Sequence, residues 1–364
     1  MMTDTAVTPG ATQARPRRRP HPARFGPLVV LVVLVALPYW SISIPGVFDA
    51  ALNKPGTLQL LALCLVFGAL ATGYDLLFGR TGLLSFGHAL YFAGGVYGTD
   101  VLVTKAGLPL WQAVLLAIVG TAGAAALLGA VALRTNGIAF AMVTLAFAQV
   151  GAITIGRDPG GVTGGEEGLP MDTAQVPSAL VGVTNTVNLY WLAVAVAVVT
   201  VLVVHAIADA PAGRVLAAIR DDERRVGVLG LDPYRYKLFA FTVAGGLAGL
   251  AGAMYALLIG GATPHVAASD QTLTLLVMVV LGGPGTRWGP LIGGMLFTYL
   301  DYRLVSFGRS DAVDSLPGVL SGPLSQPLFV LGTVFILAVY FFPGGLAGLR
   351  TRLGPLARWI PDRR

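Results

Sequence analysis

Long runs of apolar residues alternate with short polar stretches along almost the whole chain. Most runs are close to about 20 residues long, which is the length a helix needs to cross the hydrocarbon core of a bilayer. We therefore predict an all-α polytopic membrane protein with about ten transmembrane helices (eight to ten), in the apolar segments 27–45, 57–78, 83–104, 109–133, 137–156, 187–206, 237–260, 270–283, 289–307 and 326–342.

The polar stretches between these runs differ in charge, and the difference predicts the orientation of the chain. Residues 211–237 carry six Arg or Lys residues, whereas residues 157–186 carry one arginine and four acidic residues. Because Lys and Arg are enriched in cytoplasmic loops, we expect 211–236 to be cytoplasmic and 157–186 to be external. Ten crossings then place both termini in the cytoplasm, giving a disordered tail (1–24), a transmembrane domain (25–350), a second external loop (308–325) and a C-terminal tail (351–364).

Composition supports the same class of protein. The chain is 55% hydrophobic and 12% charged with a mean hydropathy of +0.75, whereas about a quarter of the residues of a soluble domain are charged. The net charge of +6 resides in tails and loops, so it indicates cytoplasmic flanks of membrane helices and not a nucleic-acid interface. The single cysteine, Cys64, predicts neither a disulfide nor a cysteine-based metal site.

Residues 211–237 are the densest charged stretch in an otherwise apolar chain. The run from Arg214 to Gly230 reads as one amphipathic helix that ends at a glycine, and its apolar positions can form a stripe of Val215, Ala218, Ile219, Val226 and Leu229. Three consecutive acids, from Asp221 to Glu223, argue against simple attraction to anionic lipid. We therefore predict that this segment is a cytoplasmic helix that contacts a soluble partner protein.

Glycine interrupts or lines several of the apolar runs. Gly79–Gly82 and Gly282–Gly289 each break one. Irregular backbone at membrane depth occurs only where protein or a water-filled path covers it, so the first break predicts either a re-entrant segment or a turn, and the second a turn. Small residues four apart, at Gly245, Gly249 and Ala253, predict closely packed helices.

Several functional classes leave no trace in the sequence. There is no G-x-x-x-x-G-K-[S/T] phosphate-binding loop, and neither a zinc-binding motif nor a Cys/His cluster with metal-ligand spacing. We therefore expect no cofactor, no metal site and no enzymatic activity in this chain. Ionisable residues within the apolar runs are few, with Asp75, His88 and Asp100 the main candidates. This scarcity favours transport driven by an external energy source over a proton- or sodium-coupled carrier.

Ordered motifs from about residue 55 to residue 350 resemble the permeases of branched-chain amino acid ABC transporters. They are G-R-T-G-L-L-S-F-G-H-A-L-Y-F-A-G-G-V-Y (79–97), T-G-G-E-E-G-L (163–169), A-G-R-V-L-A-A-I-R-D-D-E-R-R-V-G-V-L-G-L-D-P-Y-R-Y-K-L-F-A-F (212–241), A-G-L-A-G-A-M-Y-A (248–256), V-V-L-G-G-P-G-T-R-W-G-P (279–290) and F-P-G-G-L-A-G-L (342–349). The T-G-G-x-x-G-L loop and the Y-K-L-F-A-F continuation resemble the M-type (LivM) subunit more than its H-type partner.

The resemblance implies an ABC importer permease fold with broken helices, in the bacterial inner (plasma) membrane, that works by alternating access. Its implied partners are an H-type permease, two cytoplasmic ATPases that bind the ATP, an extracytoplasmic substrate-binding protein and membrane lipid. The residues implied to contact the ATPases are Ala218, Ile219, Arg220, Asp221, Asp222, Glu223 and Gly230. Residues implied to meet the binding protein are Thr163, Gly164, Gly165, Glu166 and Glu167. Candidate residues of the substrate path are Ser85, Gly87, His88, Gly94, Gly95 and Tyr97.

Two alternatives remain open at this point. One keeps the ABC class but replaces the cargo with urea, short amides or another small polar solute, because urea permeases share parts of the motifs. The other is a self-sufficient secondary carrier or channel. Copurifying ATPases would distinguish the ABC readings from the carrier, and the pocket of the binding protein would distinguish the two cargoes.

Overall fold

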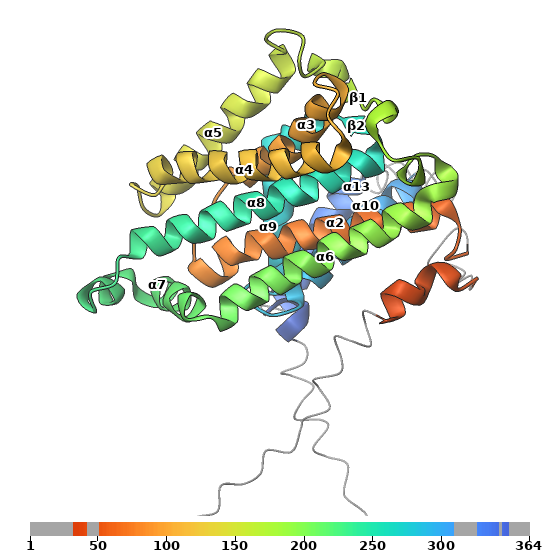
Figure 1. Ribbon diagram of the computed structural model, residues 1–364. Helices are drawn as coiled ribbons and strands as arrows, with labels where there is room; N and C mark the ends of the chain where they lie inside the picture. The colour runs from red at the N-terminus through yellow and green to blue at the C-terminus, as the bar shows by residue number, and fades with distance from the viewer. Residues whose placement is uncertain (1–31, 42–50, 309–325, 342–343, 349–364) are drawn as a thin grey trace, which may run out of the picture.

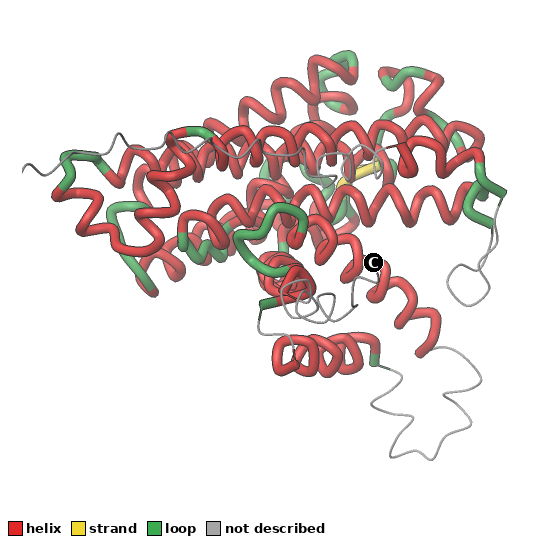
Figure 2. The backbone as a smooth tube through the Cα atoms, turned by 90° about the horizontal axis from the view of Figure 1, so that it is seen from below, coloured by secondary structure: helices red, strands yellow, loops and turns green. Residues whose placement is uncertain are grey.

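The computed structural model describes residues 32–41, 51–308, 326–341 and 344–348, and in these residues it is almost entirely helical (Figures 1 and 2). The tails 1–24 and 351–364 and residues 309–325 of the second external loop lie outside the described part. The longer helices are α2 (Pro55–Asp75), α3 (His88–Thr104), α4 (Leu110–Ala132), α5 (Ile138–Arg157), α6 (Thr186–Asp209), α7 (Pro211–Val228), α8 (Pro233–Ile259), α9 (Ser269–Gly282), α10 (Gly289–Gly308) and α13 (Pro327–Phe341).

Five of the described helical segments are long and apolar enough to cross a membrane. They are Pro55–Thr81, Leu110–Ala132, Ile138–Arg157, Val183–Asp209 and Pro233–Ile259, and Asp270–Gly282 is a shorter apolar helix. Each apolar segment predicted after residue 56 corresponds to one helix of the structure. The largest difference is α3, which begins at His88 and not at residue 83. The chain is therefore a multi-pass membrane protein.

Two opposite ends of the helix bundle carry the non-helical parts that matter for function (Figure 1). At one end, here called the α7 end, α6 leads into α7, and the hydroxyl of Tyr234 at the start of α8 donates to the carbonyl of Ala130 near the end of α4 (2.9 Å). At the other, here called the β1–β2 end, β1 (Leu169–Pro170) pairs antiparallel with β2 (Gly261–Ala262). The external loop predicted at 157–186 lies at the β1–β2 end.

The core of the bundle depends on glycines of α8. A Cβ at Gly95 of α3 would overlap the backbone of Gly249, and a Cβ at Gly252 would overlap the carbonyl of Phe92. On the α4 side, a Cβ at Gly249 would overlap the hydroxyl of Thr121. The backbones of α3 and α8 therefore approach to a distance that only glycine permits, which maximises dispersion contacts between helices. The predicted close packing of this helix is confirmed.

The first glycine interruption takes an unexpected form. α2 continues beyond Asp75 into a π-helical turn, Leu76–Thr81, which ends where Gly82 adopts the left-handed φ of 77°. Residues 82–87 are then neither helix nor strand before α3 begins. The second interruption is a turn between α9 and α10, as predicted. It lies against the π-helical turn of α2, because the Gly285 N–H donates to Asp75 at 2.7 Å.

Candidate functional site

The charged segment after α6 folds into α7 with a kink. Pro211 starts the helix, where its missing N–H costs nothing. At Asp222 the backbone is extended (φ −159°, ψ 101°), and its carboxylate accepts from the backbone N–H groups of Arg224 (3.0 Å) and Arg225 (3.2 Å). Asp222 therefore caps the second half of α7. Gly230 follows with a φ of 81°, so the predicted glycine stop is confirmed, but the predicted single helix is kinked.

The kink redistributes the apolar side chains of α7. Leu216, Ile219 and Val226 are buried against the bundle, whereas Val228 is 88% exposed and Leu229 is 79% exposed. The predicted stripe was therefore wrong in including Ala218 and Leu229, which are exposed, and in omitting Leu216. A stripe spaced at 3.6 residues per turn assumes one straight helix, and the break at Asp222 rotates the second half, which carries Leu229. Leu216 and Ala218 precede the break, so their burial and exposure depend on which face of the first half packs against the bundle. Two large apolar residues are left exposed at the tip.

The charged residues of α7 divide between internal contacts and solvent. Glu223 pairs with Lys237 of α8 at 2.5 Å, and this lysine is almost completely buried. Arg225 pairs with Asp222 on the helix itself (2.9 Å). Ala218 and Asp221 are exposed. Among the predicted coupling residues, Ile219 and Glu223 thus hold α7 on the bundle, while Ala218 and Asp221 face outward.

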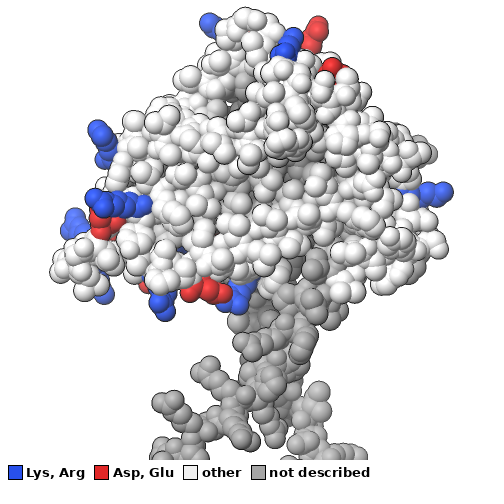
Figure 3. Space-filling view, in the orientation of Figure 1, with Lys and Arg blue, Asp and Glu red and all other residues white. Residues whose placement is uncertain are grey.

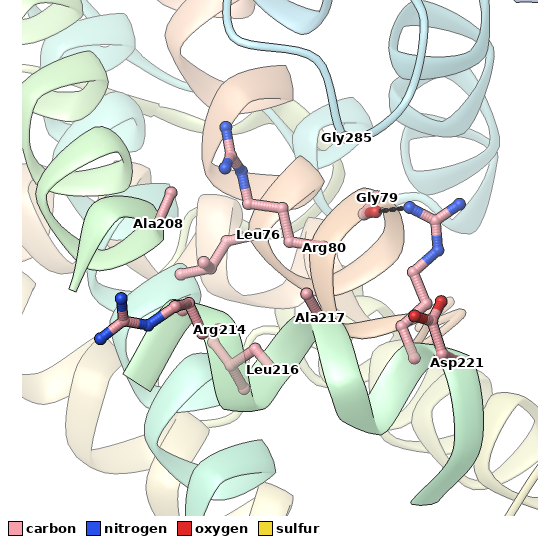
Figure 4. Close-up of a pocket in the computed structure, with 11 residues that line it drawn as sticks. Leu76, Gly79, Arg80, Ala208, Arg214, Leu216, Ala217, Asp221 and Gly285 are labelled. Carbon is pink, nitrogen blue, oxygen red and sulfur yellow. Dashed lines mark hydrogen bonds between the residues drawn. The ribbon is translucent and has the colours of Figure 1, made fainter. Parts of the chain in front are cut away.

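A junction of three segments lies beneath α7 (Figure 4). The guanidinium of Arg220 donates to the carbonyl of Gly79 in the π-helical turn, as the dashed line in Figure 4 marks. The Asp75 carboxylate, 1% exposed, lies 3.6 Å from the Nε of Arg80 and accepts from Gly285. We call Asp75, Gly79, Arg80, Arg220 and Gly285 the α2 junction. It borders a cavity of about 260 Å³ whose lining includes Leu76, Ala208, Arg214, Leu216, Ala217 and Asp221.

The non-helical segment 82–87 is held by side chains from three helices. Tyr74 of α2 donates its hydroxyl to the carbonyl of Ser85 (2.9 Å). The Phe86 N–H donates to the hydroxyl of Thr144 in α5 (3.1 Å), and the Ala89 N–H donates to Thr272 in α9 (3.0 Å). These bonds satisfy backbone groups that no helix ladder reaches.

Two of the predicted path residues, Ser85 and His88, lie at this segment and are fully buried. Gly87 is also buried, and it lies so close to α5 that an added Cβ would overlap the backbone of Thr144. His88 lies beside the ring of Tyr74, with centroids 5.1 Å apart. Neither imidazole nitrogen of His88 has a hydrogen-bond partner among the described residues. An unpaired buried polar group is costly, and His88 is inaccessible to solvent in this conformation.

The other predicted path residues lie further along α3. Gly94 borders Thr121 of α4, and Gly95 contacts the backbone of Gly249. Both therefore serve helix packing. Tyr97 is buried, and its hydroxyl lacks a hydrogen-bond partner within the described part of the chain. The structure thus brings Ser85, Gly87 and His88 together and places the remaining three residues elsewhere.

The predicted docking loop is a tight, anchored turn at the β1–β2 end. Asp158 accepts from both the N–H (2.6 Å) and the hydroxyl (2.9 Å) of Thr163. These hydrogen bonds to Thr163 hold the pKa of the Asp158 carboxyl below its usual range. Gly164 and Gly165 have positive φ values of 76° and 60°, and Gly165 is buried. Glu166 and Glu167 are exposed, so this turn presents two carboxylates to solvent.

Charge is distributed on the surface as expected for a membrane protein (Figure 3). On the face shown, most charged side chains gather at the α7 end and around the loop 157–186, and a broad uncharged surface lies between. Only 22% of the spanning window of α4 and 28% of that of α5 is buried. These two helices therefore offer apolar surface to lipid or to another membrane subunit. No group of three or more His, Cys, Asp or Glu residues that could hold a metal ion occurs within the described ranges.

Sequence reasoning missed Thr144, Thr272 and the partners of Asp75. Thr144 lies within the apolar α5, and Thr272 lies in the polar first turn of α9, next to Gln271; a threonine hydroxyl in a helix usually bonds to the backbone of its own helix. Nothing local to the sequence indicates that they reach segment 82–87. Asp75 was recognised as unusual, but its acceptance from Gly285, 210 positions away, carries no local signal.

Comparison with known proteins identifies the family. Residues 56–339 match the family described as branched-chain amino acid transport system / permease component. The chain belongs to this family. Its fold therefore serves an ABC permease, as the motifs predicted, and the related proteins are transporter subunits rather than enzymes.

The curated relatives of this permease agree. It is 28% identical over 345 residues to the high-affinity branched-chain amino acid transport system permease protein LivM of Salmonella typhimurium, covering 88% of this chain and 73% of that protein. It is 29% identical over 317 residues to the LivM of Escherichia coli, covering 80% and 70%. A probable branched-chain amino acid transport permease protein LivM of Methanocaldococcus jannaschii is 25% identical over 160 residues, covering 43% and 45%.

Proposed function

We propose that this chain is the M-type permease subunit of an ATP-driven importer that moves branched-chain amino acids across the bacterial inner membrane by alternating access. The likeness to the LivM permeases supports the cargo. The observation that supports drive by ATPases is the kinked α7, which projects from one end of the bundle and exposes Val228 and Leu229 beside charged residues. An apolar centre bordered by charged residues has the arrangement of a protein–protein interface. Two cytoplasmic ATPases, which bind the ATP, are its proposed partners.

The rest of the topology follows from this assignment. With α7 in the cytoplasm, ten crossings place both termini there, and the loop 157–186 faces outward. We expect the exposed carboxylates of Glu166 and Glu167, together with residues 308–325, to meet an extracytoplasmic binding protein. The second permease, of the H type, completes the pore. Electrostatic contacts of this kind mainly set the association rate and the register of a complex.

The proposed substrate path passes the segment at Ser85, Gly87 and His88. A zwitterionic amino acid needs polar groups for its charges and an apolar wall for its side chain. The unpartnered imidazole of His88, the adjacent ring of Tyr74 and the start of α3 supply both kinds of surface. Rigid-body rocking of the bundle, driven by the ATPases, would open this region to alternate sides.

The decisive experiment is purification of the tagged protein in mild detergent, identification of copurifying proteins, and reconstitution into liposomes. We expect a second permease and two ATPases to copurify, and leucine uptake to require ATP and the binding protein. Uptake of urea but not leucine would replace the cargo and keep the transporter class. Recovery of the chain alone, with uptake intact in the absence of ATPases, would overturn the proposal.

A further inference from the structure

The α2 junction lies between the part of the chain proposed to meet the ATPases and the part proposed to meet substrate. Arg220 belongs to α7, Asp75 and Gly79 belong to the end of α2, and Gly285 belongs to the α9–α10 turn. Polar contacts join all three segments: Arg220 to the Gly79 carbonyl, and Gly285 to the Asp75 carboxylate. A displacement of α7 therefore acts directly on the π-helical turn.

The close approach at the α2 junction makes this contact specific. A Cβ at Gly79 would overlap both the Asp75 carboxylate and the backbone nitrogen of Gly285. A Cβ at Gly285 would lie 2.9 Å from the Gly79 carbonyl oxygen and 3.1 Å from the Arg220 guanidinium. Asp75 is nearly inaccessible, and a buried carboxylate is tolerated only when it is paired and hydrogen-bonded. The three backbones are thus held in one arrangement.

The α2 junction continues directly into the segment that carries His88. Arg220 also packs on Gly82, where an added Cβ would lie 3.1 Å from the Arg220 Cγ. Gly82 is the first residue of the non-helical segment, and Tyr74, adjacent to Asp75, donates to Ser85 within it. The segment between the α2 junction and His88 has no helix ladder of its own. Its position is therefore set by these side chains and by a backbone hydrogen bond from the Leu83 N–H to the Leu77 carbonyl (2.9 Å).

The contact between α7 and the π-helical turn is partly open. The cavity of about 260 Å³ lies between them and is lined by residues of both, including Leu76 and Ala217 (Figure 4). Arg220 lies at the edge of this cavity, where its guanidinium donates to the Gly79 carbonyl and its Cγ packs on Gly82.

We propose that Arg220 and Asp75 are positioning residues that transmit the movement of α7 to the segment 82–87 and so couple ATP hydrolysis to opening of the path at His88. This inference rests on the proposed function. It gives the Arg220 guanidinium the Gly79 carbonyl as its partner, in place of the ATPase contact predicted for Arg220 from the sequence, and it assigns no substrate contact to either residue. It requires that loss of the contact uncouple the two activities, leaving hydrolysis and assembly in place while transport falls.

The test uses the purified full complex in liposomes, with radiolabelled leucine, and measures leucine imported per ATP hydrolysed. We expect Arg220→Gln to lower this ratio about tenfold, the effect of one lost charge-assisted hydrogen bond, with binding-protein-stimulated hydrolysis retained. Arg214→Gln is the matched control, because Arg214 lines the same cavity but donates nothing to the π-helical turn among the described contacts. Its ratio should equal that of the wild type.

Asp75 provides an independent variant in case Arg220→Gln does not fold. Asp75→Asn keeps an oxygen that can accept from Gly285 and should retain most of the coupling, whereas Asp75→Ala should lose it. A wild-type ratio in Arg220→Gln would overturn the inference, and so would loss of the ATPases from that variant, because Arg220 would then act in assembly. Absence of ATP-driven uptake in the wild-type complex would instead contradict the proposed function.

Discussion

At the scale of single residues, the position of the exposed tip of α7, Val228 to Gly230, depends on the left-handed backbone conformation of Gly230 more than on side-chain contacts. Gly230 has a φ of 81°, and an added Cβ there would meet nothing within 4 Å. Any effect of a substitution at Gly230 must therefore come from backbone strain. Gly227, three residues earlier, is helical and equally open around its Cα. Substitutions at Gly230 and Gly227 therefore distinguish an effect of backbone conformation from an effect of side-chain contacts.

We predict that Gly230→Ala weakens the binding of the ATPases without affecting membrane insertion. A left-handed conformation costs a non-glycine residue about 1–2 kcal/mol, and releasing it would shift the exposed Val228 and Leu229. Copurification of the ATPases should fall several-fold. Gly227→Ala should leave recovery unchanged, since alanine is favoured in a helix. Equal recovery in the two variants would show that the tip conformation does not matter for docking.

At the scale of elements, the α3–α8 contact shows what holds the bundle together. Lipid is as apolar as a leucine side chain, so membrane helices associate through close packing rather than through burial from water. The backbone contact of Gly95 with Gly249 meets this requirement. The glycine spacing in α8 predicted such a contact. Which helices would be the partners, α3 and α4, could not be predicted, because spacing describes one face of one helix.

Replacing Gly95 by alanine should therefore destabilise the protein. The added methyl overlaps the Gly249 backbone, and overpacking of this kind costs about 1–3 kcal/mol. Thermal unfolding in detergent should show a lower midpoint for Gly95→Ala. Gly120→Ala in α4 is the control, because a Cβ there meets nothing within 4 Å. A lower midpoint for both variants would mean that glycine content in general, and not this contact, is what matters.

At the scale of the whole molecule, the two ends of the bundle differ in structure and should lie on opposite sides of the membrane. The α7 end carries the exposed tip at Leu229, and the β1–β2 end carries the exposed Glu166. The only native cysteine, Cys64, is buried. Introduced cysteines can therefore be labelled with little background, which makes the orientation directly measurable.

A membrane-impermeant maleimide should label Glu166→Cys from outside intact cells. Leu229→Cys should react only after the membrane is opened or in inside-out vesicles. The physical reason is the charge asymmetry of the loops, since basic loops remain in the cytoplasm. Labelling of both positions from the same side would contradict the proposed orientation and with it the assignment of α7 to the ATPases.

The sequence alone determined the membrane class, the family resemblance, the glycine stop at Gly230 and the approximate positions of the helices, because apolar run length, loop charge and backbone-permissive residues are local properties. It misplaced the start of α3, which lies at His88 and not at residue 83. It did not determine the kink at Asp222, which sends Leu229 outward, or the pairing of Glu223 with Lys237. Nor did it predict the convergence of Asp75, Arg220 and Gly285. These features were decided by the tertiary structure, because a buried charge takes whichever partner the packed helices bring to it, and that partner can lie anywhere in the chain.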